Sequence, residues 1–326
     1  MTTPCEPMLL KAAGKHSLWG GDKLIKEYGK NYLEAPLAET WECSTHENGL
    51  SYVDSGIWKG RTLKSVLKEH PEFLGSKYAS TGELPILIKF IDANKDLSIQ
   101  VHPNDTFASR YEHGALGRTE MWYVVEAVPG SHLIYGFYDD VNESLVREKI
   151  SSKQVIKLLN KIPVTKGDVF YIKPGTVHAL CGGCLVVEVQ QNSDLTYRLY
   201  DYDRVDEKGR KRSLQIDKAL SVCNFTKQNC RQRKLRIFKF WQGFEEVLLC
   251  SCPFFIVTKY VINTKNNIIR SNGNSGTILV CVNGSCMLGG IEGDSKILRK
   301  GNTVFVPAIV PTICISGRAE ILKINY

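Results

Sequence analysis

Four potential metal ligands lie on short apolar, strand-like runs that are far apart in the sequence. Gln100 and His102 are two residues apart, so on a strand both side chains point to the same face. Glu120 and His178 can join them only inside a closed β structure that brings distant runs together. Two imidazoles, a carboxylate and an amide suit a divalent metal ion. This pattern therefore predicts a mainly β fold with a candidate metal site.

The apolar pattern predicts one helical interruption and two domains. Residues 139–162 contain two stretches with helical spacing, Asn142–Glu148 and Ser152–Asn160. We predict that residues 1–235, including this insert, form the metal-binding domain. Residues 236–326 would form a metal-free β domain, because no histidine follows His178. Its expected strands are Phe254–Val261, Gly276–Val282, Cys286–Gly289, Thr303–Val306 and Ala319–Ile324, with a turn at Asn283-Gly284.

Composition excludes several classes of protein. The chain has 326 residues, of which 43% are hydrophobic, as in an ordinary globular protein. No apolar run approaches the roughly 18 residues that a membrane helix needs, so no membrane partner is expected. Residues 1–5 lack the order of a signal peptide, and the 11 cysteines show no disulfide-framework spacing. We therefore expect a cytoplasmic protein with reduced thiols.

The net charge of +8 is concentrated in two basic segments, Lys208–Arg212 and Arg231–Lys239. No helix-turn-helix, zinc-finger or RNA-binding signature accompanies them, so the sequence predicts no nucleic-acid partner. Solvated surface is the simpler interpretation of these residues. A phosphorylated small substrate in a locally positive cleft also fits this charge.

Other reactive side chains allow two interpretations each. Lys89 lies within the β run 84–91, where a buried ammonium needs a partner or a wet cavity, unless it is an edge lysine that extends to solvent. His46 and His70 could be further ligands, although a loop histidine and a helix C-terminal histidine are simpler interpretations. Cys181 and Cys184 have no second pair at zinc-site spacing, which favours a structural turn.

The spacing around His178 resembles a cupin motif. The segment Gly167–His178 is similar to the second half of the cupin double-stranded β-helix motif, with one extra residue between its glycine and proline. Gln100-x-His102 with Glu120 is similar to the first half. The segment Gly301–Pro307 repeats the same skeleton without the histidine. The resemblance implies two cupin-type β-barrel domains, one of which has lost its metal.

A closer resemblance covers essentially the whole chain. The sequence resembles the type I mannose-6-phosphate isomerase (phosphomannose isomerase) family, in its short bacterial form. Each supporting motif is modestly specific, but their joint occurrence in this order is strongly specific. These motifs are Leu18–Gly21, Ala38–Ser44, Leu97–Asp105, Thr119–Tyr123 and Asn192–Arg198.

The resemblance implies a reaction and a set of site residues. The reaction is the reversible isomerisation of mannose 6-phosphate to fructose 6-phosphate, in which a base removes the C2 proton, a cis-enediol forms and the proton returns at C1. One zinc ion per chain would be held by Gln100, His102, Glu120 and His178. The residues implied to act on the substrate are Lys89, Asp194, Arg198 and Arg118, with Ser98 and Arg204 at its phosphate.

Arg118 is a departure from the family pattern. Many members have a lysine two residues before the metal-binding glutamate, and a guanidinium does not release its proton at working pH. Arg118 would therefore fix charge, which leaves Asp194, Lys89 or a metal-bound hydroxide as the base.

Two other classes of function compete with the isomerase. One is another metal-dependent cupin sugar enzyme, such as a dioxygenase or a sugar-nucleotide epimerase. A dioxygenase would bind its metal with three histidines, or with two histidines and a carboxylate. It would not need the phosphate-oriented cations Lys89 and Arg198. The other is a non-catalytic regulator that binds a sugar phosphate, and retention of four metal ligands argues against it.

Overall fold

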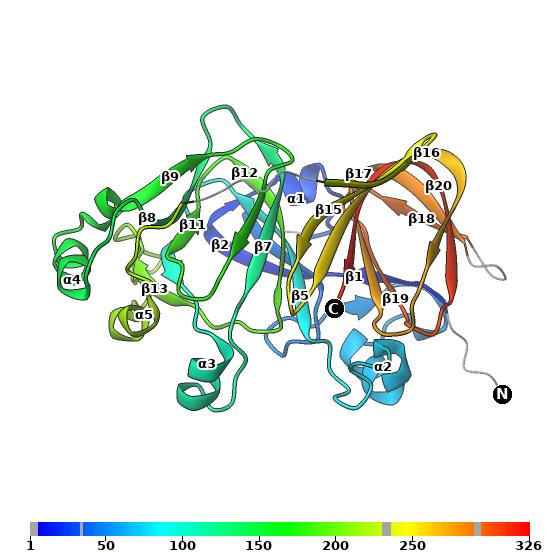
Figure 1. Cartoon of the computed structure of the whole chain (residues 1–326), viewed down its shortest axis with the longest axis horizontal. Helices are drawn as coiled ribbons and strands as arrows, with labels where there is room; N and C mark the ends of the chain where they lie inside the picture. The colour runs from blue at the N-terminus through cyan, green and yellow to red at the C-terminus, as the bar shows by residue number, and fades with distance from the viewer. Residues whose placement is uncertain (1–5, 33–34, 230–235, 290–294) are drawn as a thin grey trace.

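The computed structural model describes residues 6–32, 35–229, 236–289 and 295–326. The opening residues, much of the basic segment Arg231–Lys239 and the predicted domain boundary at residue 235 lie outside these ranges. The chain is mainly β, with strands in three sheets. In Figure 1 two of these sheets form one side of the molecule, and the third forms the other side. No sheet closes into a barrel within the described ranges.

The first two sheets carry the region around the predicted ligands. The six-stranded sheet has the order β10 (Val169–Ile172), β7 (Glu120–Ala127), β12 (Cys184–Gln191), β5 (Ile86–Ala93), β2 (Ala13–Gly21) and β3 (Leu37–Cys43). The five-stranded sheet has the order β13 (Tyr197–Tyr200), β6 (Ile99–Val101), β11 (His178–Leu180), β8 (His132–Phe137) and β9 (Leu159–Pro163).

The nine-stranded sheet contains the C-terminal strands and two strands from early in the chain. Its order is β14 (Arg236–Trp241), β15 (Phe244–Ser251), β16 (Ile256–Arg270), β20 (Thr312–Asn325), β17 (Thr277–Gly289), β19 (Thr303–Val306), β1 (Met8–Lys11) and β4 (Tyr52–Val53), and β18 (Lys296–Arg299) pairs with β17. Because β1 and β4 hydrogen-bond into this sheet, it includes residues on both sides of the predicted boundary. The division into 1–235 and 236–326 stays a prediction.

Short helices lie around the sheets and at their ends (Figure 1). The α-helices are α1 (Lys23–Lys26), α2 (Leu63–Glu69), α3 (Asp105–Tyr111), α4 (Glu143–Ser151) and α5 (Ile216–Val222). The 3-10 helices are η1 (Gly56–Trp58), η2 (Pro71–Leu74) and η3 (Val155–Leu158). Asn104 and Asn142 cap α3 and α4, because each side-chain oxygen accepts a hydrogen bond from a backbone N–H in the first turn.

The predicted helical insert is partly wrong. Its first stretch forms α4, but Ser152–Asn160 gives only the turn η3 and then enters strand β9. The side-chain amide of Asn160 donates to three backbone carbonyls, those of residues 135, 137 and 228. Tertiary hydrogen bonds of this kind override the helical spacing of the local sequence.

The turn predicted at Asn283-Gly284 is also wrong. Both residues lie inside the continuous strand β17, where the pairing with β20 shifts register between Cys281 and Asn283. Gly284 has a φ of 72°, and a Cβ there would lie 2.2 Å from the carbonyl oxygen of Arg318. The glycine therefore permits an irregular strand rather than a chain reversal.

Side chains alternate between two apolar cores along the central strands. In β5, Ile88 and Phe90 pack into a core shared with the nine-stranded sheet, whereas Ile91 packs into a core shared with the five-stranded sheet. The same alternation in β7 and β12 explains why these strands are almost wholly buried. The inner faces of the six- and five-stranded sheets therefore enclose one interior, and polar residues on those faces meet inside it.

Candidate metal centre and active site

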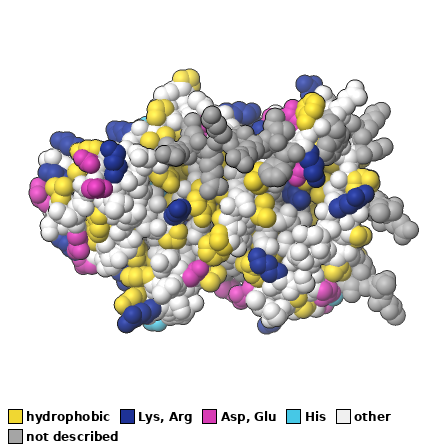
Figure 2. Space-filling view, in the orientation of Figure 1, with side chains coloured by type: hydrophobic (Ala, Val, Ile, Leu, Met, Phe, Trp, Pro, Cys, Tyr) yellow, Lys and Arg dark blue, Asp and Glu magenta, His cyan; other side chains and the backbone are white. Residues whose placement is uncertain are grey.

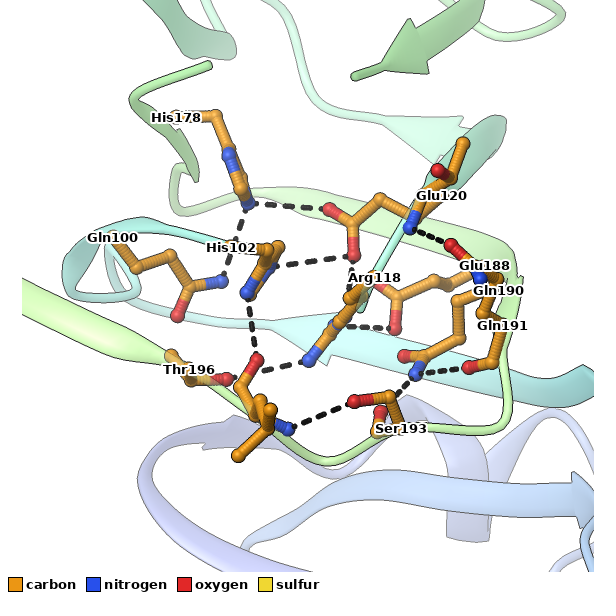
Figure 3. Close-up of polar contacts among 12 residues, drawn as sticks. Gln100, His102, Arg118, Glu120, His178, Glu188, Gln190, Gln191, Ser193 and Thr196 are labelled. Carbon is orange, nitrogen blue, oxygen red and sulfur yellow. Dashed lines mark hydrogen bonds and ion pairs between the residues drawn. The ribbon is translucent and has the colours of Figure 1, made fainter. Parts of the chain in front are cut away.

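The candidate metal ligands meet because three strands of the five-stranded sheet are in register. Gln100 on β6 lies opposite His178 on β11 and opposite Arg198 on β13. Directly opposed residues point to the same face of a sheet, so these side chains form one row. His102 follows β6, and Glu120 begins β7 in the other sheet. The ligand atoms of His102, Glu120 and His178 all lie within 4.8 Å of one another (Figure 3).

The two imidazoles are oriented by backbone carbonyls. His102 Nδ1 lies 2.8 Å from the carbonyl oxygen of Leu195, and His178 Nδ1 lies 2.9 Å from that of Thr176. A carbonyl can only accept, so each Nδ1 donates and Nε2 is the ring nitrogen left to bind a metal. Both Nε2 atoms face Glu120, at 3.5 Å from His102 and 3.1 Å from His178. This arrangement is typical of histidines that bind a metal.

Unsatisfied buried atoms provide a test of whether a metal ion fits. His102 Nε2 and Glu120 Oε1 are buried and have no hydrogen-bond partner within the described ranges. Burial, helped by the positive charge of Arg118, holds the pKa of His102 well below its usual range. Burial opposes ionisation of Glu120, but Arg118 and the two imidazoles hold the pKa of its carboxyl well below the usual range. Two imidazoles beside a carboxylate form a donor set that fits a divalent cation.

Gln100, the fourth predicted ligand, lies beside this group. Its amide nitrogen is placed 3.5 Å from His178 Nε2, which puts the side-chain amide beside the ligand atoms. Figure 3 shows Gln100, His102, His178 and Glu120 directed toward one another. Of the alternative ligands, His70 instead contacts Glu72 and stacks on Phe73.

Arg118 is held between two buried carboxylates. Its Nε donates to Glu120 Oε2 at 2.7 Å, and its Nη2 donates to Glu188 Oε1 at 3.0 Å. The third nitrogen, Nη1, donates to Thr196 Oγ1 at 3.3 Å. Burial opposes the charge, but the two carboxylates outweigh burial and raise the pKa of the guanidinium. Arg118 is therefore a fixed positive charge behind the metal ligands (Figure 3).

Glu188 is a site residue that the sequence interpretation missed. It is 1% exposed, and it accepts hydrogen bonds from Trp122 Nε1 at 2.7 Å and from Arg118. Lys89 Nζ lies 3.2 Å from the same carboxylate, in register across strands β5 and β12. A charge inside the apolar run Leu185–Val189 was the available signal, but the sequence alone did not show which strand lies beside it.

Lys89 is buried with partners rather than extended to solvent. Besides Glu188, its ammonium contacts Glu39 at 3.5 Å and lies 4.9 Å from the centre of the Trp41 ring. Trp41 Nε1 in turn donates to Glu39 at 2.8 Å. Glu39 was not predicted either, and it lines the same cavity as Lys89.

A small cavity of about 90 Å³ gathers most of the predicted substrate residues. Asp194 lies at its exposed side and accepts a hydrogen bond from Asn48 at 2.9 Å. The residues on its wall include Lys89, Ser98, Gln100, Arg118, Asp194 and Arg198. Arg204 is not among them, and lies instead on a larger outer cavity of about 590 Å³. Arg212, which the sequence interpretation placed on solvated surface, lines both cavities.

The remaining sequence expectations concern cysteines and surface charge. Burial raises the pKa of Cys181 and raises that of Cys184 to about 11, so both are poor ligands at neutral pH and the structural interpretation of this pair is preferred. Lys, Arg, Asp and Glu side chains are scattered over the face shown in Figure 2 rather than gathered into one patch. Among the described helices, none is long and apolar enough to cross a membrane.

A mainly β chain with a buried histidine–glutamate–histidine group beside a charged cavity has the features of a metal-dependent protein that acts on a polar ligand. The family model "phosphomannose isomerase type I, catalytic domain" matches residues 8–121. The chain is 37% identical to the mannose-6-phosphate isomerase of Streptococcus mutans over 97% of each sequence, and 40% identical to mannose-6-phosphate isomerase ManA of Bacillus subtilis over 98% of each. The chain therefore belongs to the type I phosphomannose isomerase family.

The fold agrees with this assignment. The crystal structure of the mannose 6-phosphate isomerase from Bacillus subtilis superimposes with a TM-score of 0.89 at 32% sequence identity. The match covers 98% of this chain and 99% of that structure, so the similarity extends over essentially the whole chain.

Proposed function

We propose that the protein catalyses the reversible isomerisation of mannose 6-phosphate to fructose 6-phosphate. The observation that carries this proposal is a cavity lined by Lys89, Arg198 and Gln100, in which Gln100 lies beside the histidine–glutamate–histidine group. Two whole-length relatives are named for this activity. An aldose–ketose isomerase needs a base for a carbon-bound proton and positive charge near the two oxygens that exchange roles.

The ion that we propose for the centre is zinc, one per chain, held by Gln100, His102, Glu120 and His178. When bound, a divalent cation stabilises negative charge that develops on a substrate oxygen. The chain itself supplies the orientation of the ligands. Carbonyl oxygens fix both imidazoles, and Arg118 fixes Glu120 Oε2 while Oε1 lies 3.1 Å from His178 Nε2.

Three side chains are proposed to act on the sugar. Asp194 is exposed on the cavity wall with Asn48 as its hydrogen-bond partner, so its carboxylate can take the C2 proton of the open-chain aldose and return it at C1. Lys89 would donate hydrogen bonds to the oxygens of the cis-enediol, and Arg198, which lines both cavities, would hold the substrate by an anionic oxygen. Arg118 has each guanidinium nitrogen occupied by protein, so it would position Glu120 and Glu188 and would not carry the proton.

The wider architecture is part of the same proposal. We infer that residues 1–235 form a catalytic cupin-type domain with an insert at about 139–162, and that residues 236–326 form a cupin-like domain without metal. A cytoplasmic location fits the nine described cysteines, all of which are free thiols.

The experiment is an assay of fructose 6-phosphate formation from mannose 6-phosphate, before and after chelation and after zinc is restored. Turnover by the metal-loaded protein that disappears on chelation and returns with zinc is the expected result. A metal-loaded, folded protein with no turnover would refute the isomerase. Full activity after complete removal of metal would refute the role of the centre while leaving the reaction in place.

A further inference from the structure

We infer that Arg212, rather than Arg204, binds the phosphate of the substrate together with Arg198. This inference rests on the proposed function for its substrate. The inner cavity beside the metal-binding group and the outer cavity share two lining residues, Arg198 and Arg212. In mannose 6-phosphate the reacting carbons and the phosphate are at opposite ends of the sugar. A molecule with C1 and C2 at the inner cavity would therefore direct its phosphate toward the outer one.

Arg204 donates a hydrogen bond to protein from each of its three guanidinium nitrogens. Its Nε donates to the carbonyl oxygen of Asp201 at 3.3 Å, its Nη1 donates to the carbonyl oxygen of Asp96, and its Nη2 donates to Asp201 Oδ1 at 2.5 Å. The guanidinium also lies 5.0 Å from the centre of the Tyr202 ring. Residues 202 and 203 both have positive φ angles, of 57° and 54°. Arg204 therefore stabilises a tight turn, and only two of its five N–H groups remain, each on a nitrogen that protein already holds.

Arg212 is held by one edge only. Its Nε donates to Asp201 Oδ2 at 2.7 Å, and its Nη2 donates to Oδ1 at 2.5 Å. Its Nη1 has no hydrogen-bond partner among the described residues, and the side chain is 34% exposed. Asp201, which is buried, thus orients the guanidinium and leaves one nitrogen available beside the cavity. A planar guanidinium in a fixed orientation suits a phosphate oxygen.

Arg198 needs an anion. Its Nε is buried without a hydrogen-bond partner, and its side chain forms no ion pair within the described part of the chain. Burial and the nearby charge of Arg212 lower the pKa of Arg198. Backbone hydrogen bonds also hold the two segments side by side. Gln215, three residues after Arg212, donates its backbone N–H to the Arg198 carbonyl, and its side-chain oxygen accepts from the Arg198 N–H. A phosphate dianion between these guanidinium groups would relieve their repulsion and satisfy their free donors.

The test compares three substitutions in the full-length, metal-loaded enzyme. Arg212→Gln is expected to raise the KM for mannose 6-phosphate roughly 10- to 100-fold with kcat within about threefold, because it removes a charge-assisted contact to the non-reacting end of the substrate. Arg204→Gln is expected to lower the melting temperature while it changes KM less than about threefold. Arg147→Gln removes the same charge from an exposed position on α4 and should leave KM and kcat unchanged.

Binding of inorganic phosphate, measured by calorimetry, is a second readout that needs no turnover. Wild-type protein and Arg204→Gln should bind phosphate, whereas Arg212→Gln should bind it at least about tenfold more weakly. If Arg212→Gln does not fold because Asp201 loses one of its two arginine partners, Arg212→Lys keeps a cation beside Asp201 and should show a smaller rise in KM. A raised KM and weakened phosphate binding in Arg204→Gln, with Arg212→Gln unchanged, would overturn the inference. A wild-type protein that binds phosphate but does not isomerise the sugar would instead refute only the proposed function.

Discussion

Glu188 is the carboxylate whose removal tests the arrangement of the site most directly. It accepts a hydrogen bond from Trp122, forms ion pairs with Lys89 and Arg118, and is itself buried. Glu188→Gln keeps the shape and removes the charge. Arg118 and Lys89 both contact Oε1, whereas Trp122 donates to Oε2, so the NH₂ group of the glutamine must face either the two cations or the indole N–H of Trp122. Two buried cations would share fewer carboxylates than before.

The expected cost follows from these contacts. Removing one partner of a buried ion pair costs about 3–5 kcal/mol, and the lower end applies because the amide keeps one hydrogen bond. For a chain of this size, about 3 kcal/mol lowers the melting temperature by roughly 6 °C. A displaced Lys89 also misplaces a donor to the substrate, for which a loss of roughly 100-fold in kcat is expected.

The assay is thermal unfolding followed by kinetics on the metal-loaded protein at a temperature where the variant is folded. Glu126→Gln is the matched control. Glu126 lies on β7 of the same sheet and pairs with Lys23 at 2.9 Å, but it is 26% exposed and outside the cavity. Because Glu126 also accepts from Tyr28 and pairs with Lys300, the variant should lose some stability but keep kcat.

Two results would refute the reasoning about Glu188. Unchanged stability and kcat in Glu188→Gln would show that Lys89 and Arg118 do not depend on this carboxylate. A loss of stability equal to that of Glu126→Gln, with full activity, would show that Glu188 is an ordinary structural acid.

Three further substitutions test other parts of the molecule. His178→Ala should lose both bound metal, measured by elemental analysis, and activity; metal retained at one ion per chain would contradict the ligand assignment. Arg198→Ala should keep its metal and lose turnover, and full activity would show that the substrate site is elsewhere. Burial raises the pKa of Asp92 to about 6 from its ordinary value of 3.8, so the folded state binds more protons than the unfolded chain between these values and stability falls as pH rises through them. Asp92→Asn should therefore raise the free energy of unfolding by about 1–2 kcal/mol at pH 8 but not near pH 4, measured by urea denaturation, whereas an equal effect at both pH values would contradict this origin.

Local spacing predicted those parts of the site in which neighbours in sequence are neighbours in space. Gln100 and His102 are two residues apart, and the strand period alone places them on one face. The joining of Glu120 and His178 to this pair depends on which strands face each other, and the local sequence does not encode that pairing. The family resemblance brought these four residues together before any strand order was known.

Glu188 and Arg212 were missed for different physical reasons. Glu188 carried a signal, because a charge inside an apolar strand needs a partner, and so did Lys89. Lys89 and Glu188 can be recognised as partners of each other only after β5 and β12 are known to be adjacent. Arg212 carried no such signal, since it belongs to an irregular basic segment that solvent alone could explain. Its orientation depends on Asp201, eleven residues earlier, and on a turn with two positive φ angles.

Secondary structure failed where tertiary pairing overrides the local pattern. Asn283-Gly284 is a strong turn signal, yet β17 has partners on both sides there, and the glycine permits a shift in register instead. In the same way, the apolar spacing of Ser152–Asn160 fits a helix. Residues Leu159–Pro163 instead hydrogen-bond to the edge of β8 as strand β9. Both errors leave the inner faces of the sheets, and so the site, unaffected.

Charge within the interior links the metal-binding group to the sugar-binding residues. The contacts join three carboxylates, Glu39, Glu120 and Glu188, to two cations, Lys89 and Arg118. Three negative and two positive charges leave one net negative charge, which a divalent cation would change to one positive charge. A lysine in place of Arg118 could not donate along two separate edges to both Glu120 and Glu188 in this geometry. The carboxylates that Arg118 connects therefore account for an arginine at this position, and they agree with our proposal that Asp194, which has fewer partners, transfers the proton.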